Sequence, residues 1–236
     1  MVDQCTDDSG LVTSSQTGVH PNLEKLVRRH LQSPWLQTFH QPTVKSYNLL
    51  KNEFVLFGSQ PIILDSGCGT GKSTRQLALR YPGNIVIGVD QSQVRLEKSG
   101  VHDSFLREGN CILLRAELST FWRLLAGDGL SPERHFLFYP NPWPKPGHLS
   151  RRWHGHPVFP QLLALGGVVE LRCNWEIYAQ EFALAVYLAS GTKVSVRQIT
   201  PQGGMTPFEQ KYLDRGQALF AVVVPAKLTQ AFKAPV

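Results

Sequence analysis

Cysteine, methionine and long apolar runs are scarce in this sequence of 236 residues, and the shortages exclude several classes of protein. The four cysteines, Cys5, Cys68, Cys111 and Cys173, contain no CxxC pair, which argues against a disulfide framework and a cysteine zinc site. No run of 18 apolar residues occurs, and no charged leader followed by an apolar stretch opens the chain. We therefore expect a soluble, cytoplasmic protein without a membrane partner.

Acidic residues are missing from residues 134–156, although the whole chain has 18 of them against 24 Lys and Arg. The charged residues of this segment are Arg134, Lys145, Arg151 and Arg152. The resulting net charge of +6 and pI near 9.3 favour a polyanionic partner. The four histidines of the segment have no neighbouring acid or cysteine, so no metal site is predicted.

Composition and periodicity divide the chain into three parts. Residues 1–20 are rich in Asp, Ser, Thr, Gln and Gly and are predicted to form a disordered tail. Helical spacing in residues 22–32 and 43–54 predicts an N-terminal helical extension over 21–60. From residue 61 onward, continuous Val, Ile and Leu runs alternate with helical segments, which predicts one α/β domain over 61–236.

The order of these segments predicts a doubly wound, mostly parallel, seven-stranded sheet with an antiparallel closing strand. Helices are expected near 72–80, 92–99 and 175–189. The stretches TKVSVRQI and QALFAVVV, separated by a Gly/Pro loop, are expected to form the closing pair of strands.

A glycine-rich turn, ILDSGCGTGKST, joins the first predicted strand to a helix, and such turns let a ligand approach the backbone closely. A triphosphate-binding loop would need glycine at Ser66. A nicotinamide fingerprint would place its third glycine three residues after the second, whereas Gly67, Gly69 and Gly71 are evenly spaced. Both readings are disfavoured.

The segment DSGCGTG resembles the first motif of class I S-adenosylmethionine-dependent methyltransferases. That resemblance implies S-adenosyl-L-methionine as the cofactor and a Rossmann-like fold. It implies cofactor-binding roles for Asp65, Gly67, Gly69 and Gly71, for Asp90 on the ribose and for Glu117 near the adenine. The residues alone leave a simpler reading open, in which Asp65 caps a helix and Asp90 opens a turn.

The apolar run in FLFYPNPWPKPG, residues 136–147, stops at an asparagine between two prolines. Pro140 and Pro142 are expected to bias Tyr139 and Asn141 toward extended backbone. Because ligands of a doubly wound sheet lie outside the carboxyl ends of its strands, Asn141 is predicted to face the reacting group. The stretch NPWP partly resembles the motif of amino methyltransferases of nucleobases and amides.

A longer resemblance links YPNPWPKPGHLSRRW, CNWEIYA and TPFEQKYLDRG to the bacterial tRNA (guanine-N7)-methyltransferases, over about Ile62 to Val224. It implies a tRNA partner, a role in tRNA processing, and Asn141 as the catalytic residue. The implied substrate-binding residues are Lys145, Asn174, Thr206, Phe208 and Glu209, and the basic run adds Arg151 and Arg152 as phosphate contacts. The family usually has Asp at Asn141 and Lys at Pro207.

Three functions therefore stay open. The first is methylation of guanosine N7 in tRNA, and the second is methyl transfer to another acceptor, an exocyclic amine or a small heterocycle. The third is RNA binding without catalysis. Asn141 separates them, because asparagine keeps the acceptor oxygen of aspartate but loses the charge that would stabilise a developing cation.

Overall fold

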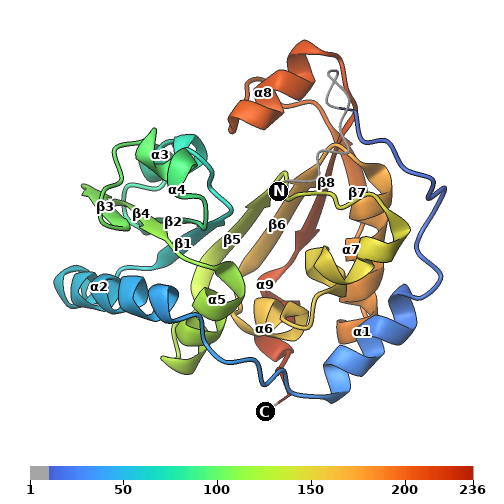
Figure 1. Cartoon of the computed structure of the whole chain (residues 1–236), viewed down its shortest axis with the longest axis horizontal. Helices are drawn as coiled ribbons and strands as arrows, with labels where there is room; N and C mark the ends of the chain where they lie inside the picture. The colour runs from blue at the N-terminus through green and yellow to red at the C-terminus, as the bar shows by residue number, and fades with distance from the viewer. Residues whose placement is uncertain (1–10, 236) are drawn as a thin grey trace.

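The computed structural model of the chain describes residues 11–235, apart from the side chains of residues 55–57. Within this part, eight strands form one sheet in the order β3-β4-β2-β1-β5-β6-β8-β7 (Figure 1). The strands are β1 (Ile62–Ser66), β2 (Ile85–Asp90), β3 (Phe105–Glu108), β4 (Cys111–Arg115), β5 (Pro132–Phe138), β6 (Val168–Cys173), β7 (Val196–Ile199) and β8 (Leu219–Val224). The five central strands β4, β2, β1, β5 and β6 are parallel, and β3, β8 and β7 pair in antiparallel fashion. This arrangement confirms the doubly wound α/β class.

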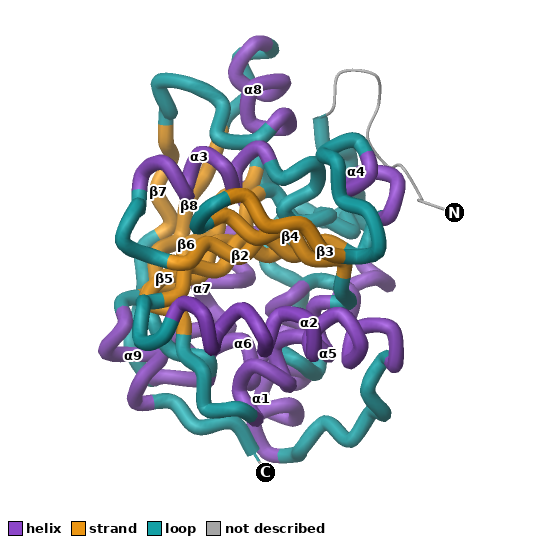
Figure 2. The backbone as a smooth tube through the Cα atoms, turned by 90° about the vertical axis from the view of Figure 1, so that its left-hand side faces the viewer, coloured by secondary structure: helices purple, strands orange, loops and turns teal. Residues whose placement is uncertain are grey.

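Helices cover both faces of the sheet, with α3 and α4 on one side and α1, α2, α5 and α6 on the other (Figure 2). They are α1 (Leu23–Gln32), α2 (Gln41–Phe57), α3 (Lys72–Arg80), α4 (Gln93–Glu97), α5 (Leu118–Gly127), α6 (Phe159–Ala164), α7 (Glu176–Ser190), α8 (Pro207–Asp214) and α9 (Ala226–Ala231), with 3-10 turns η1 (Pro146–Arg151) and η2 (Trp153–Gly155). None of the helices in the described part is long and apolar enough to cross a membrane.

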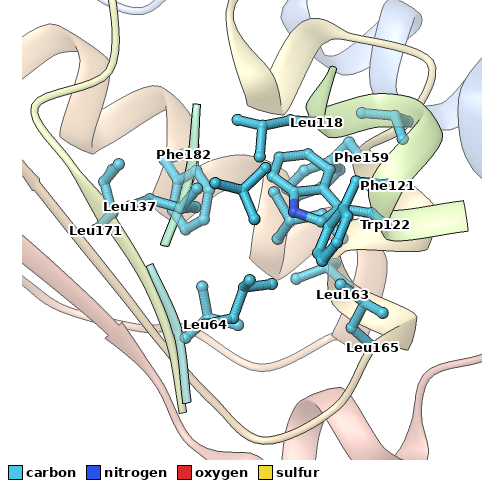
Figure 3. Packing of buried hydrophobic residues seen from close by; sticks show 14 of the residues in the cluster. Leu64, Leu118, Phe121, Trp122, Leu137, Phe159, Leu163, Leu165, Leu171 and Phe182 are labelled. Carbon is cyan, nitrogen blue, oxygen red and sulfur yellow. The ribbon is translucent and has the colours of Figure 1, made fainter. Parts of the chain in front are cut away.

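The continuous apolar runs of the inner strands follow from burial on both faces. In β1, Ile62 and Leu64 enter the larger core with α5, α6 and α7, whereas Ile63 enters the smaller core beneath α3 and α4. Figure 3 shows the larger core around Trp122 of α5. The indole Nε1 of Trp122 donates to Ser66 Oγ over 3.0 Å, so this core also anchors the carboxyl end of β1.

The sheet has one strand more than the seven expected. β3 forms a hairpin with β4 through Gly109 and Asn110, and Gly109 has φ +59°. The sequence predicts one strand in this region, CILLRAE, whereas the segment FLREGNCILLR contains two. A further difference is α8, which lies in the stretch predicted to be a Gly/Pro loop.

The predicted tail over residues 1–20 falls partly outside the described residues. Its remainder contacts the domain: Ser14 Oγ donates to the Pro144 carbonyl over 2.6 Å, and Gln16 Nε2 donates to Glu181 Oε1 over 2.6 Å. These partners are 130 and 165 residues away in sequence. Local composition therefore carried no information about them.

Candidate active site

The carboxyl ends of the parallel strands meet at one edge of the sheet and carry its polar residues. β1 pairs in parallel with both β2 and β5, so the turn after β1 lies between the ends of its two neighbours. Asp65 is near the end of β1, Asp90 ends β2, and Asn141 follows β5 by three residues. The topology thus brings the glycine turn, the second carboxylate and the asparagine to the same edge.

The three glycines of the turn after β1 all have left-handed backbone. Gly67, Gly69 and Gly71 have φ values of +82°, +60° and +70°, which glycine adopts without steric penalty. A Cβ on Gly71 would lie 2.7 Å from Leu113 Cδ1, whereas a Cβ on Gly67 would meet nothing within 4 Å. The absence of a side chain at Gly71 therefore lets the turn pack closely against Leu113 of β4. The space beside Gly67 is open, so a ligand can approach the backbone there.

Asp65 is a buried carboxylate with one oxygen satisfied and one not. Its Oδ2 accepts hydrogen bonds from Ser73 Oγ (2.6 Å) and Thr74 Oγ1 (2.7 Å) in α3. Its Oδ1 is buried and has no partner among the described residues. Burial raises the pKa of Asp65 to about 6, against the effect of the two hydroxyls and with a contribution from Asp90. An unpaired buried oxygen is costly, so the site is suited to a ligand that donates a hydrogen bond there.

Asp90 links the glycine turn to the start of α4. Its Oδ2 accepts from Gly69 N (2.9 Å) and from Arg95 Nη1 (3.3 Å), and its Oδ1 accepts from Ser92 N (2.7 Å). The carboxylate is only 4% exposed, whereas the Arg95 side chain is 48% exposed. Because the backbone N–H groups of Gly69 and Ser92 also hold this carboxylate, a polar ligand group can replace the exposed Arg95 side chain and leave the turn in place.

Glu117 caps its own helix. Its carboxylate accepts from the backbone N–H groups of Ser119 and Thr120, each over 2.8 Å, at the start of α5. Burial by itself would raise the pKa of Glu117, but these hydrogen bonds outweigh it and lower the pKa. Both oxygens are engaged, so the geometry favours a positioning role for Glu117 over direct contact with an adenine.

The segment after β5 forms a tight elbow, residues 139–143, that differs from its predicted geometry. Tyr139 has φ +51° and Trp143 has φ +45°, so the expectation of extended backbone at Tyr139 is wrong. The proline bias is overridden because Tyr139 N–H donates to the Arg172 carbonyl over 2.7 Å. Asn141 is exposed, and its Oδ1 accepts from Trp143 N over 3.2 Å. Left-handed non-glycine residues are strained, and such strain is typical of functional sites.

One side of the elbow is held by a buried carboxylate on α8. Glu209 is 0% exposed; its Oε1 accepts from Tyr139 OH (2.8 Å) and Arg172 Nη1 (3.0 Å), and its Oε2 from Met205 N (2.5 Å). Thr206 caps the same helix through an Oγ1 that accepts from Glu209 N over 2.9 Å. In this structure the predicted substrate-binding residue Glu209 therefore holds the elbow through Tyr139, and the predicted substrate-binding residue Thr206 caps the helix that carries Glu209.

The other side of the elbow is held by Arg152, which is 0% exposed. Its guanidinium donates to the Trp143 carbonyl from Nε (3.2 Å) and Nη2 (3.0 Å), to Glu181 Oε2 (2.6 Å) and to Gln16 Oε1 (3.0 Å). It also stacks over the Trp175 ring at 4.8 Å. Arg152, which the basic run predicted as a phosphate contact, is fully buried in this structure and its guanidinium is occupied by these partners.

Four predicted substrate-binding residues retain accessible surface. Lys145 and Arg151 are exposed on the loop after the elbow, and Arg151 lies over the Trp143 ring at 4.7 Å. Phe208 at the start of α8 is 47% exposed. Asn174, after β6, is half-buried and donates to Gln217 Oε1 over 3.1 Å.

Several residues that shape the site were not predicted from the sequence. Ser73 and Thr74 follow Gly71 by two and three residues, and hydroxyls at the start of a helix are a local signal for a carboxylate partner. Glu181 had no such signal. It lies 29 residues from Arg152 and 27 from His154, and only the packing of α7 brings the three together.

Comparison with known proteins identifies the family. Residues 59–222 match the family model described as putative methyltransferase, a span that covers both the glycine turn and the elbow. The chain belongs to this methyltransferase family.

Curated relatives include tRNA (guanine-N(7)-)-methyltransferases from several bacteria. The Streptomyces coelicolor protein is 30% identical over 185 residues, which cover 70% of this chain and 64% of that protein. The Bordetella pertussis protein is 30% identical over 134 residues, which cover 52% of this chain and 50% of that protein. The chain thus spans about half to two thirds of the length of these relatives.

Solved structures share the fold at low sequence identity. The 16S rRNA methyltransferase KamB is 19% identical with a TM-score of 0.53, over 87% of this chain and 99% of that one. A variant of the 16S rRNA (adenine(1408)-N(1))-methyltransferase from Catenulisporales acidiphilia, solved with the cosubstrate SAM, is 15% identical with a TM-score of 0.51, over 78% of this chain and 92% of that one.

Proposed function

We propose that the chain is an S-adenosylmethionine-dependent methyltransferase that methylates N7 of a guanosine in tRNA. The observation that carries this proposal is the juxtaposition, at the ends of the paired strands β1 and β5, of a glycine turn with an unpartnered Asp65 oxygen and a strained elbow bearing Asn141. The family membership and the names of the tRNA-modifying relatives agree with it.

The residues of the glycine turn fit the cofactor. The buried Asp65 Oδ1 lacks a donor, and the amino group of S-adenosylmethionine would supply one. Open space at Gly67 admits the amino acid portion close to the backbone. Asp90 would accept from the ribose hydroxyls in exchange for Arg95, which is a typical role for an acid at the end of the second strand. When bound, the cofactor supplies an electrophilic methyl group on a sulfonium.

Asn141 would orient the acceptor base. Guanine N7 has an in-plane lone pair and needs no deprotonation, so the protein must mainly hold the base in line with the methyl group. The elbow is suited to this because Arg152 fixes the carbonyl of Trp143 and Glu209 fixes the hydroxyl of Tyr139. The exposed amide of Asn141 can hydrogen-bond a base edge, but it brings no charge to stabilise the cationic product.

Incubation of the purified protein with labelled S-adenosylmethionine and unmodified tRNA, followed by nucleoside mass analysis, tests the proposal. We expect N7-methylguanosine in the tRNA, and we expect Asn141→Asp to form it faster because a carboxylate stabilises the developing positive charge. Cofactor binding without any labelled RNA would contradict the proposal. Salt-sensitive tRNA binding without methyl transfer would instead indicate a non-catalytic RNA-binding protein.

Methyl transfer to a different acceptor is the second candidate, and the presence of Asn141 in place of the usual aspartate favours it. The amide oxygen of Asn141 can accept a hydrogen bond from an exocyclic amine, and such an acceptor does not require a carboxylate at this position. This candidate predicts labelled products from an RNA-free cell extract. It also predicts that Asn141→Asp does not increase their rate of formation.

A further inference from the structure

A basic cleft lies beside the candidate active site on the α3 side of the sheet. Its volume is about 530 Å³, and its walls include Lys72, Gln76 and Arg80 of α3, Arg172 of β6, and residues of the segment 201–210. None of the described residues that line the cleft is acidic. Because Met205 and Gln210 also line it, the cleft reaches the segment that carries Glu209 and so adjoins the elbow.

The cleft exists because the α3–α4 layer stops short of β6. α3 packs on β2 and β4, and α4 packs on β4; Figure 1 shows both helices over that half of the sheet. On the same face of β6, Glu170 and Arg172 are each 18% exposed, and Val223, which pairs with Glu170 from β8, is 44% exposed. This face of β6 and β8 is therefore partly open to solvent and carries charged side chains.

Lys72 and Arg80 supply the net charge of the cleft. Arg172 is neutralised by ion pairs with Glu170 (2.7 Å) and Glu209 (3.0 Å). Arg80 is exposed, with the Tyr81 ring 5.8 Å from its guanidinium as neighbour. Lys72 is half-buried, and its side-chain ammonium forms no hydrogen bond or ion pair with any described residue. A bound anion would stabilise the positive charge of Lys72 by pairing with it.

The spacing along α3 suits a chain of phosphates rather than one ion. Lys72, Gln76 and Arg80 stand at positions i, i+4 and i+8, which form one stripe on a helix. Eight residues at 1.5 Å of rise separate the two cations by about 12 Å along the helix axis. Each cation can therefore contact a different phosphate, with the Gln76 amide available between them.

We propose that this cleft binds the RNA backbone at nucleotides flanking the acceptor guanosine, with Lys72 and Arg80 contacting separate phosphates. The proposal rests on the proposed function, because it assigns a docking surface for the same RNA substrate. Phosphate contacts of this kind position a nucleic acid without reading its sequence. They complement the exposed Lys145 and Arg151 beyond the elbow, so the acceptor base would be flanked by basic surface on two sides.

The test compares two double variants of the full chain, each of which removes two positive charges. One is Lys72→Ala with Arg80→Ala in the cleft, and the matched control is Lys25→Ala with Arg29→Ala on exposed positions of α1. Affinity for tRNA is measured by fluorescence anisotropy from 50 to 200 mM salt, with calorimetry of S-adenosylmethionine binding on the same samples. Loss of two phosphate contacts should flatten the slope of log K against log[salt] by about 1.4 to 1.8. The KM for tRNA should rise with little change in kcat.

The outcomes separate this inference from the function on which it rests. The cleft variant should bind S-adenosylmethionine like the unmodified chain, and the control variant should keep the original salt slope. If the chain methylates tRNA but both double variants keep the original slope and KM, the cleft is not an RNA-binding surface and the proposed function still stands. If the unmodified chain neither binds nor methylates tRNA, both proposals fail together.

Discussion

Asp65 combines a buried position with an unsatisfied oxygen, and this combination makes it sensitive to pH. Its pKa is raised to about 6 by burial, so the folded chain prefers the protonated form below that pH. A cofactor amino group that donates to Oδ1 requires the ionised form. The residue therefore couples ligand binding to proton release in a window near neutrality.

The expected consequence is a fall in S-adenosylmethionine affinity as the pH drops through 6. Affinity should be nearly constant between pH 7 and 8. Below about pH 6 it should fall by up to about tenfold for each unit by which the pH drops, because each bound ligand must displace one proton from Asp65. Calorimetric titration at several pH values measures this. Asp65→Asn should bind weakly and lose the pH dependence, while Asp103→Asn at an exposed turn should behave like the unmodified chain. A pH-independent affinity in the unmodified chain would remove Asp65 from the binding site.

Gly71 is the glycine of the turn whose replacement the structure penalises most clearly. Gly71→Ala places a methyl group 2.7 Å from Leu113 Cδ1 at φ +70°. The left-handed backbone costs about 1–2 kcal/mol, and overpacking adds about 1–3 kcal/mol. Urea denaturation should show that loss, whereas Gly83→Ala, with nothing within 4 Å and no left-handed φ, should change stability by less than about 0.5 kcal/mol. Adding Leu113→Ala to Gly71→Ala should recover part of the stability that is lost through overpacking. If the two substitutions lower the free energy of unfolding by strictly additive amounts, the contact does not exist.

At the scale of elements, α8 links helix capping to the geometry of the elbow. The stretch TPFE has the form of a capping box, and Thr206 Oγ1 does accept from Glu209 N. Glu209 then reaches Met205 N rather than the N-cap residue's own N–H, and its other oxygen is left for Tyr139 and Arg172. The start of this short helix therefore determines where the elbow's carboxylate partner lies.

Removal of the cap should weaken α8. Thr206→Ala leaves the N–H of Glu209 without its acceptor and should lower the free energy of unfolding by about 1 kcal/mol. Thermal unfolding compared with Thr200→Ala, an exposed threonine in the preceding loop, isolates the capping effect from the loss of a hydroxyl. Equal stabilities of the two variants would show that the hydrogen bond contributes nothing.

At the scale of the whole molecule, the buried pair Arg152–Glu181 connects segments that are far apart in the chain. Glu181 on α7 accepts from Arg152 (2.6 Å), from Gln16 (2.6 Å) and from His20 N (2.9 Å), and it contacts His154 Nε2 at 2.9 Å. Burial alone would raise the pKa of Glu181, but His154 and Arg152 outweigh it and lower the pKa to about 2. A folded-state pKa below the unfolded value stabilises the fold above about pH 4.5, and that stabilisation is lost as the pH falls toward 2.

Breaking this pair should be the most damaging of these changes. Glu181→Ala leaves Arg152 buried without a counter-charge and should cost about 3–5 kcal/mol, measured by urea denaturation at pH 7. Glu24→Ala, which breaks an exposed ion pair with Arg28 on α1, should cost less than about 1 kcal/mol. Because Arg152 also holds the Trp143 carbonyl, methyl transfer should fall in Glu181→Ala even at temperatures where the variant is folded. Full activity in a folded Glu181→Ala protein would show that the elbow does not depend on the pair.

The regular elements of the domain were predictable because their signals are local. Lys72–Arg80 was expected as a helix near 72–80, and the doubly wound sheet followed from apolar runs buried on both faces. The hairpin of β3 and β4 was not predicted because only the apolar run CILLRAE reads as a strand, whereas FLRE, before the Gly109–Asn110 turn, has two charged residues out of four. α8 was missed although Thr206, Pro207 and Glu209 mark a helix start, because the surrounding glycines and prolines suggested a loop.

The sequence by itself determined the fold class, the glycine turn and the family resemblance, because periodicity and short motifs act over a few residues. Only the tertiary structure decided which charged groups face a ligand. Arg151 and Arg152 are neighbours with the same chemistry, yet one lies on the surface over Trp143 and the other is buried against Glu181. The cleft between α3 and the segment 201–210 likewise depends on where a helix layer ends over the sheet. Burial and charge pairing are set by residues distant in sequence, so no local pattern could assign them.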